Sequence, residues 1–295
     1  MKHPLPVLFS LVLVLSLAAC GAVPAPAPSA PPGSDVPAEG TEVSTPADTS
    51  ESPVPGADQA RRAAFAKVLR TAHDQQVLSD GTPLEGGSIE AIEGNLFALH
   101  DVDGDGQEEL ILLWQNATMA GQMEVVYGYD GAAGQVRQEL REFPGVIFYT
   151  GGAAEAPWSH NQGWAGAFWP YTLYRWQPET DTYETMGSVD AWDSTLVSCG
   201  FPRGVDTDGD GVIYFLLTDN WSFTAHRDPE SGEEYWYYEQ PPVDGAEYLR
   251  WREDVVGAED FLELSFQSLT AENIADVLEV PYEPLLTTLT PNAAG

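Results

Sequence analysis

Residues 97–114 read FALHDVDGDGQEELILLW, and this stretch decides much of the fold. A short apolar run, an acidic loop at 101–109 and a longer apolar run follow one another, which predicts a strand, a loop and a second strand. Four of the five carboxylates in that loop are spaced so that they can face inward, and two glycines allow the chain to turn tightly. Such crowding of negative charge is costly unless a cation lies among the carboxylates.

We therefore predict that this loop binds calcium, a hard cation that takes carboxylate and carbonyl oxygens. The predicted ligands are the side chains of Asp101, Asp103, Asp105 and Glu109 and the main-chain carbonyl of Gln107. The loop is not an EF-hand, because its twelfth position is the strand-like Leu112 rather than a glutamate. Ligands from one contiguous loop favour a structural ion, with a dissociation constant of roughly 0.1 to 1 mM. The alternative is a solvated acidic turn.

A second acidic loop, residues 206–214, repeats the first five steps of this pattern. Its predicted ligands are Asp206, Asp208, Asp210 and the carbonyl of Val212. The ninth position departs from the pattern, because Tyr214 stands where the first loop has a carboxylate. Water or a carboxylate from elsewhere would complete this shell, and the site would be weaker. The alternative is a hairpin turn that merely favours Asp and Gly.

The N-terminal residues predict export and anchoring. Residues 1–19 combine a lysine, an apolar run and small residues, which is typical of a signal peptide and too short for a spanning helix. The sequence LAACG at 17–21 resembles the lipobox of bacterial lipoproteins, which implies a lipid on Cys20. The alternative is an ordinary signal peptide followed by a cysteine. Residues 20–57, rich in Pro, Ala and acidic residues, predict a disordered tether.

Residues 58–295 are expected to form one domain of the mainly β (α+β) class. Apolar spacing predicts an amphipathic helix from 58 to about 78, and Thr270 is placed to cap a short helix at 271–278. Short β-branched and aromatic runs separated by turn signals predict an antiparallel meander, with a propeller-like arrangement left open. The predicted strands are 123–129, 136–143, 146–149, 171–176, 182–189, 212–217 and 236–238.

An aromatic stretch at residues 158–171 is the candidate ligand-binding surface. Indole rings stack on sugar faces and amides bond their hydroxyls, so this composition suits a glycan or a protein ligand. The candidate residues are Trp158, His160, Asn161, Trp164 and Trp169. The alternative is a loop whose aromatic side chains fill the core.

Composition excludes some classes of function. The formal net charge of −34 opposes binding to nucleic acid and to anionic lipid surfaces. The sequence contains none of the common nucleophile, zinc-protease or nucleotide-binding motifs, so no catalytic residue is assigned.

Two resemblances extend these inferences. The hairpin motif D-x-D-x-D-G-x-x-E resembles the calcium loop of integrin-type, FG-GAP and VCBS repeats, which implies a calcium cofactor. Most of the chain resembles uncharacterised cell-surface lipoproteins of clostridial Gram-positive bacteria, which implies attachment to the outer face of the cytoplasmic membrane and no particular mechanism. We expect a lipid-anchored, extracytoplasmic, non-enzymatic binding module. The alternatives are a calcium-dependent hydrolase of wall or host glycans and a purely structural surface protein.

Overall fold

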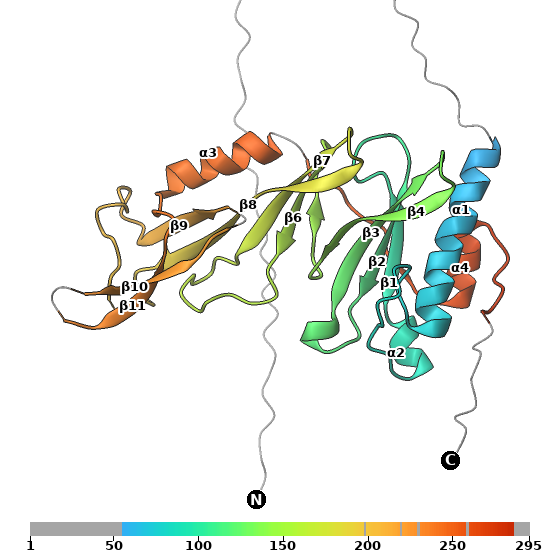
Figure 1. The fold of residues 1–295 in the computed structure, drawn as a ribbon, viewed down its shortest axis with the longest axis horizontal. Helices are drawn as coiled ribbons and strands as arrows, with labels where there is room; N and C mark the ends of the chain where they lie inside the picture. The colour runs from blue at the N-terminus through green and yellow to red at the C-terminus, as the bar shows by residue number, and fades with distance from the viewer. Residues whose placement is uncertain (1–54, 198, 219, 229–230, 258–259, 286–295) are drawn as a thin grey trace, which may run out of the picture. The chain divides into compact units, whose positions relative to one another are not determined.

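The computed structural model describes residues 55–197, 199–218, 220–228, 231–257 and 260–285, which are mainly β with antiparallel pairing (Figure 1). The first sheet has the strand order β12 (Gln267–Ser268), β1 (Leu96–His100), β2 (Glu109–Trp114), β3 (Met123–Asp130) and β4 (Gln135–Glu142). The second has the order β5 (Ile147–Phe148), β6 (Ala153–Pro157), β7 (Tyr171–Gln177), β8 (Thr182–Asp193) and β9 (Val212–Leu217). A separate hairpin pairs β10 (Phe223–Arg227) with β11 (Glu234–Tyr238).

The predicted antiparallel β class is therefore confirmed, whereas the propeller-like arrangement is not found. Propeller blades are four-stranded sheets repeated around an axis. The described residues instead form two five-stranded sheets and one two-stranded hairpin. Strand-like sequence with frequent turns does not distinguish these architectures, because consecutive strands pair in each of them and the sequence does not show at which turn one sheet ends and the next begins.

Helices lie near both ends of the described chain, as predicted. α1 (Pro55–Arg70) begins three residues before the predicted domain boundary and continues as a π-helical turn, Thr71–Gln75. α4 (Ala271–Leu278) is capped by the Thr270 hydroxyl, which accepts a hydrogen bond from Asn273 N at 3.1 Å. Shorter helical segments are α2 (Ile89–Glu93) and a 3₁₀ turn, Met119–Gly121.

The helix α3 (Gly245–Val256) was not among the sequence predictions. Its start carries a capping box, in which the Asp244 carboxylate and the Glu247 side chain each satisfy a backbone N–H at the helix N-terminus. The D-x-x-E pattern of that box was the available signal.

The first sheet is buried on both faces, which explains the unbroken apolar run in β2. Leu110 and Leu112 pack with α1 and α4, which lie side by side along one face (Figure 1). Ile111 points the other way and packs with residues of the second sheet, including Ala154 and Trp176. A strand covered on both faces needs no polar positions, so its sequence shows no alternation.

Replacing Phe97 tests this core. Phe97 in β1 is 0% exposed among α1, α4 and the first sheet, whereas Phe261 is 63% exposed and serves as a control of the same chemistry. We expect Phe97→Ala to lower the free energy of unfolding by about 3 to 5 kcal/mol and Phe261→Ala by less than about 0.5 kcal/mol. Urea denaturation measures both, and equal losses would contradict this assignment of the core.

Candidate metal centre

The first acidic loop joins β1 to β2 and folds back on itself through two glycines. Gly104 and Gly106 adopt φ values of +81° and +91°, a region that other residues rarely enter. The Asp101 carboxylate accepts hydrogen bonds from both of their backbone N–H groups, at 2.8 and 3.0 Å. Asp103 accepts from Asp105 N at 2.9 Å, and Asp105 accepts from Gln107 N at 2.6 Å. These bonds fix the direction of each carboxylate.

Three of the predicted ligands converge. Asp101, Asp103 and Glu109 each offer a carboxylate oxygen, and these oxygens all lie within 4.8 Å of one another. Asp103 is 7% exposed and Glu109 is 3% exposed. Asp105 lies outside this triad and also accepts from the Gln107 side chain, at 3.0 Å. The loop therefore presents an acidic pocket with two buried carboxylates.

Burial makes this arrangement costly when the carboxylates are charged. It raises the pKa of Glu109 to about 9, and the nearby Asp103 carboxylate adds to the shift. Burial likewise raises the pKa of Asp103 to about 6, with Asp105 and Asp101 contributing. The Val102 N–H, which donates to Glu109 Oε2 at 2.9 Å, offsets part of the cost for Glu109. A proton or a divalent cation would remove the remainder.

The second loop has the same local geometry. Asp206 accepts from Gly209 N at 2.8 Å and from Gly211 N at 3.2 Å. Asp208 and Asp210 accept from the N–H groups two residues later, at 3.0 and 2.7 Å. Oxygens of these three aspartates also lie within 4.8 Å of one another. Each of the four hydrogen bonds has its counterpart in the first loop.

Asp244 makes the hydrogen bond to the second loop that Glu109 makes within the first, although its carboxylate is not part of the converging aspartate group. Tyr214 continues β9 and pairs through its backbone with Val243, which brings the next residue to the loop. Asp244 Oδ2 accepts from Thr207 N at 3.0 Å, as Glu109 Oε2 accepts from Val102 N in the first loop. Asp244 is 7% exposed, and hydrogen bonds led by the Thr207 hydroxyl lower its pKa. Without a metal, the carboxylate beside this loop is therefore stabilised by hydrogen bonds to a greater extent than the buried carboxylates of the first loop.

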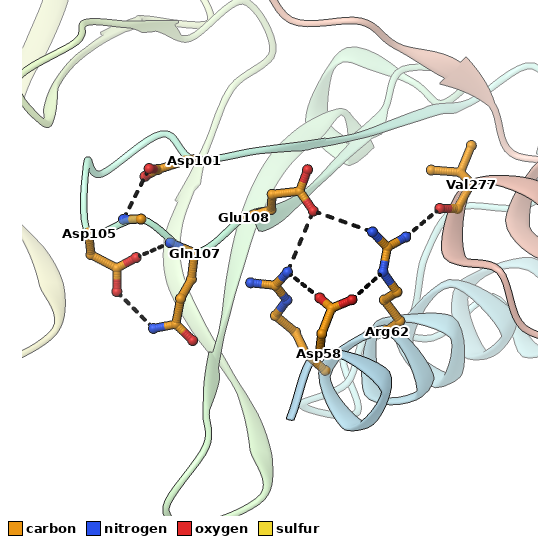
Figure 2. A network of polar contacts seen from close by, with 9 residues as sticks. Asp58, Arg62, Asp101, Asp105, Gln107, Glu108 and Val277 are labelled. Carbon is orange, nitrogen blue, oxygen red and sulfur yellow. Dashed lines mark hydrogen bonds and ion pairs between the residues drawn. The ribbon is translucent and has the colours of Figure 1, made fainter. Parts of the chain in front are cut away.

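Contacts with α1 hold the first loop from outside. Figure 2 shows Glu108 turned toward α1, where Arg61 and Arg62 lie 3.6 and 4.0 Å from its carboxylate. Both arginines also pair with Asp58, and Arg62 donates to the Val277 carbonyl in α4 at 3.0 Å. These partly exposed ion pairs contribute little stability each, but they fix the position of the loop against both helices.

The aromatic candidates divide between two places. Trp158 and His160 line one open groove of about 390 Å³ together with Trp221, whose ring stacks on Trp158 at 5.9 Å and 18°. Glu142 lines the same groove. Burial raises the pKa of its carboxyl group, and a hydrogen bond from Tyr174 offsets only part of this rise. Sequence reasoning missed Glu142 and Trp221, because neither lies within residues 158–171.

The other candidates have different surroundings. Trp164 packs edge-on against Trp192 and lines a second groove with Trp236. Asn161 accepts a hydrogen bond from Gly163 N at 3.0 Å, so it serves a local turn. Trp169 is exposed and donates to the Trp158 carbonyl at 2.6 Å.

The N-terminal predictions lie almost entirely outside the described residues. Cys20, the signal peptide at 1–19 and the tether up to residue 54 belong to that part of the chain. Among the described residues, no helix combines the length and the apolar character needed to span a bilayer. Comparisons with protein-family models, curated proteins and solved structures found no match. The resemblance to clostridial lipoproteins therefore stays a prediction.

The buried carboxylates predict how stability depends on pH. An unfolded glutamate titrates near 4.5 and Glu109 near 9, so between these values the folded state holds more protons than the unfolded state. In chelator, we expect the free energy of unfolding to fall as pH rises from about 5 to 9, by up to about 1.4 kcal/mol per pH unit for each such group.

Thermal or urea denaturation across this pH range measures the slope. Calcium should reduce the decline, because the ion replaces the protons. Glu109→Gln should remove part of the decline, since glutamine is neutral at every pH. A flat profile in chelator would contradict the assignment.

Proposed function

We propose that this protein is a calcium-binding, non-enzymatic ligand-binding module, anchored outside the cytoplasmic membrane through a lipid on Cys20. The observation that carries the calcium assignment is the shared geometry of the two acidic loops. Each directs three aspartates by the same backbone hydrogen bonds, and in each a further buried carboxylate, Glu109 or Asp244, accepts a hydrogen bond from the second residue of the loop. The lipobox-like sequence at 17–21 supports the anchor.

Calcium suits these loops better than other common ions. Their side-chain donors are hard carboxylate oxygens, and calcium accepts the irregular coordination that a hairpin loop provides, whereas magnesium requires a near-ideal octahedron. Extracellular calcium sites bind at roughly 0.1 to 1 mM, which matches a protein displayed outside the cell.

The proposed role of the ions is structural. In the first loop, calcium would fix the β1–β2 hairpin and remove the cost of burying Asp103 and Glu109. In the second loop, it would tie the start of β9 to Asp244 at the N-terminus of α3. The ions would thereby stabilise the scaffold that carries the aromatic groove.

Thermal melting of the full chain tests calcium binding. At ten times its dissociation constant, each filled site should add about 1.4 kcal/mol, or very roughly 3 to 6 °C. Asp103→Asn and Asp208→Asn keep the hydrogen bonds from Asp105 N and Asp210 N but remove the charge. Both variants should therefore show a smaller gain in calcium than the unmodified chain.

Asp130→Asn is the matched control, because Asp130 accepts backbone hydrogen bonds in the β3–β4 turn and belongs to neither predicted loop. Its gain in calcium should equal that of the unmodified chain. The calcium proposal fails if melting is unchanged by calcium, or if magnesium at the same concentration gives an equal rise.

The groove beside Trp158 is the proposed ligand site. Its volume of about 390 Å³ lies in the range of small-molecule sites, and the stacked rings of Trp158 and Trp221 offer an aromatic surface for a sugar. His160, Gln162 and Thr172 line the same groove and supply hydrogen-bonding groups. This combination favours a glycan ligand.

Titration with soluble peptidoglycan fragments, followed by isothermal calorimetry in calcium, tests the groove. Trp158→Ala and Trp221→Ala should each weaken binding about tenfold, corresponding to about 1.4 kcal/mol. Trp236→Ala is the control, since this exposed indole lines the other groove. Equal affinities in all four proteins would exclude the groove as the site.

One observation favours a hydrolase as the second candidate. Glu142 and His160 line the same aromatic groove, and the raised pKa of Glu142 suits a general acid. Glycosidases ordinarily use two carboxylic acids, and the described groove residues supply one. Shortened fragments after incubation with the unmodified chain, absent with Glu142→Gln, would favour the hydrolase over the binding module.

A further inference from the structure

A second group of carboxylates adjoins the first loop. Asp103, Glu139 in β4 and Asp181 in the β7–β8 turn each offer an oxygen, and these oxygens lie within 4.8 Å of one another. Asp103 therefore belongs to two acidic groups, one within its own loop and one that reaches both sheets. The residues are 36 and 42 positions apart along the chain, counted as 139 − 103 and 181 − 139.

Glu139 is directed to this place by the backbone. β3 and β4 pair with a shift in register, in which Val126 faces Leu140 and Tyr127 faces Gln138. Glu139 is the extra residue of this bulge, and bulges commonly redirect a side chain. Gly128 makes room for it, because a Cβ there would lie 1.7 Å from Glu139 Oε1.

The Glu139 carboxylate is buried and incompletely paired. The residue is 8% exposed, and its Oε2 has no hydrogen-bond partner. Its Oε1 lies 3.7 Å from Arg137, whose guanidinium also pairs closely with Asp181. A buried carboxylate oxygen without a hydrogen-bond donor costs free energy. A cation bound to this oxygen would remove that cost.

The charge balance of this group favours an additional cation. Three carboxylates face one guanidinium, which gives a formal excess of two negative charges in the group. The Arg137 side chain is already 36% exposed, so it can turn further into solvent and leave the carboxylates. Glu139, by contrast, has a side chain that is only 2% exposed and is held at the bulge.

We propose that Asp103, Glu139 and Asp181 form a third site for a divalent cation, in addition to the two loop sites. This site lies next to the ion of the first loop, and Asp103 bridges the two ions. The inference rests on the proposed calcium function, because Asp103 is shared. Calcium is the expected occupant, since the donors are carboxylate oxygens from three irregularly placed segments. The cation displaces Arg137 from Asp181 and links β4 of the first sheet to the β7–β8 turn of the second.

The stoichiometry of bound calcium tests this position in the full chain. Equilibrium dialysis at saturating calcium should give three ions for the unmodified chain, one for each loop and one for this position. Glu139→Gln and Asp181→Asn should each bind two. Asp181 has φ +56°, which asparagine also tolerates, so that variant keeps its turn. Glu184→Gln, an exposed β8 residue outside the group, is the control and should bind three.

Arg137→Gln gives an expectation of the opposite sign. Without the guanidinium competing for Asp181, the third ion should bind at least threefold more tightly in calorimetry. Unchanged or weaker binding would overturn the proposal. Melting in chelator confirms folding, because Glu139→Gln removes an incompletely paired buried carboxylate and should not destabilise the metal-free chain.

The two levels of proposal fail in different ways. Equal numbers of bound ions in the unmodified chain, Glu139→Gln and Asp181→Asn would overturn the bridged position and leave the loop sites standing. Absence of calcium binding in the unmodified chain would overturn the loop sites as well. Another outcome is that every protein binds two ions but Glu139→Gln binds them more weakly. This result would make Glu139 a ligand of the loop ion and would also overturn the bridged site.

Discussion

Removing Asp103 and Glu109 from water is the constraint on which this part of the structure depends. The two carboxylates lie at the base of a hairpin loop whose strands are buried on both faces. Tyr183 of the second sheet donates to the Val102 carbonyl at 3.0 Å, within the same loop. The position of the loop is therefore coupled to the packing of the two sheets.

The two acidic loops show how one local motif is completed in two ways. In the first, the closing carboxylate is Glu109, which opens the next strand of the same hairpin. In the second, it is Asp244, which also caps a helix. The first loop takes this carboxylate from within its own nine residues, whereas the second takes it from a segment about thirty residues later in the chain.

The aromatic groove is also built from residues that lie far apart in the chain. Trp158 and Trp221 stack although 63 positions separate them, counted as 221 − 158, and Glu142 reaches the groove from the first sheet. Packing between the two sheets brings these residues together. The proposed structural ions and the proposed ligand surface would therefore be compatible parts of one binding module.

The sequence by itself determined the features that depend on neighbouring residues. These are the β1–β2 hairpin, the converging Asp101, Asp103 and Glu109, the helices α1 and α4, and the antiparallel β class. Only the tertiary structure decided what Glu139, Asp181 and Asp244 contact. A bulge between β3 and β4 directs Glu139, the packing of the two sheets brings it close to Asp103 and Asp181, and the start of α3 brings Asp244 to the second loop. Sequence spacing does not specify these contacts, because they join segments that lie far apart along the chain.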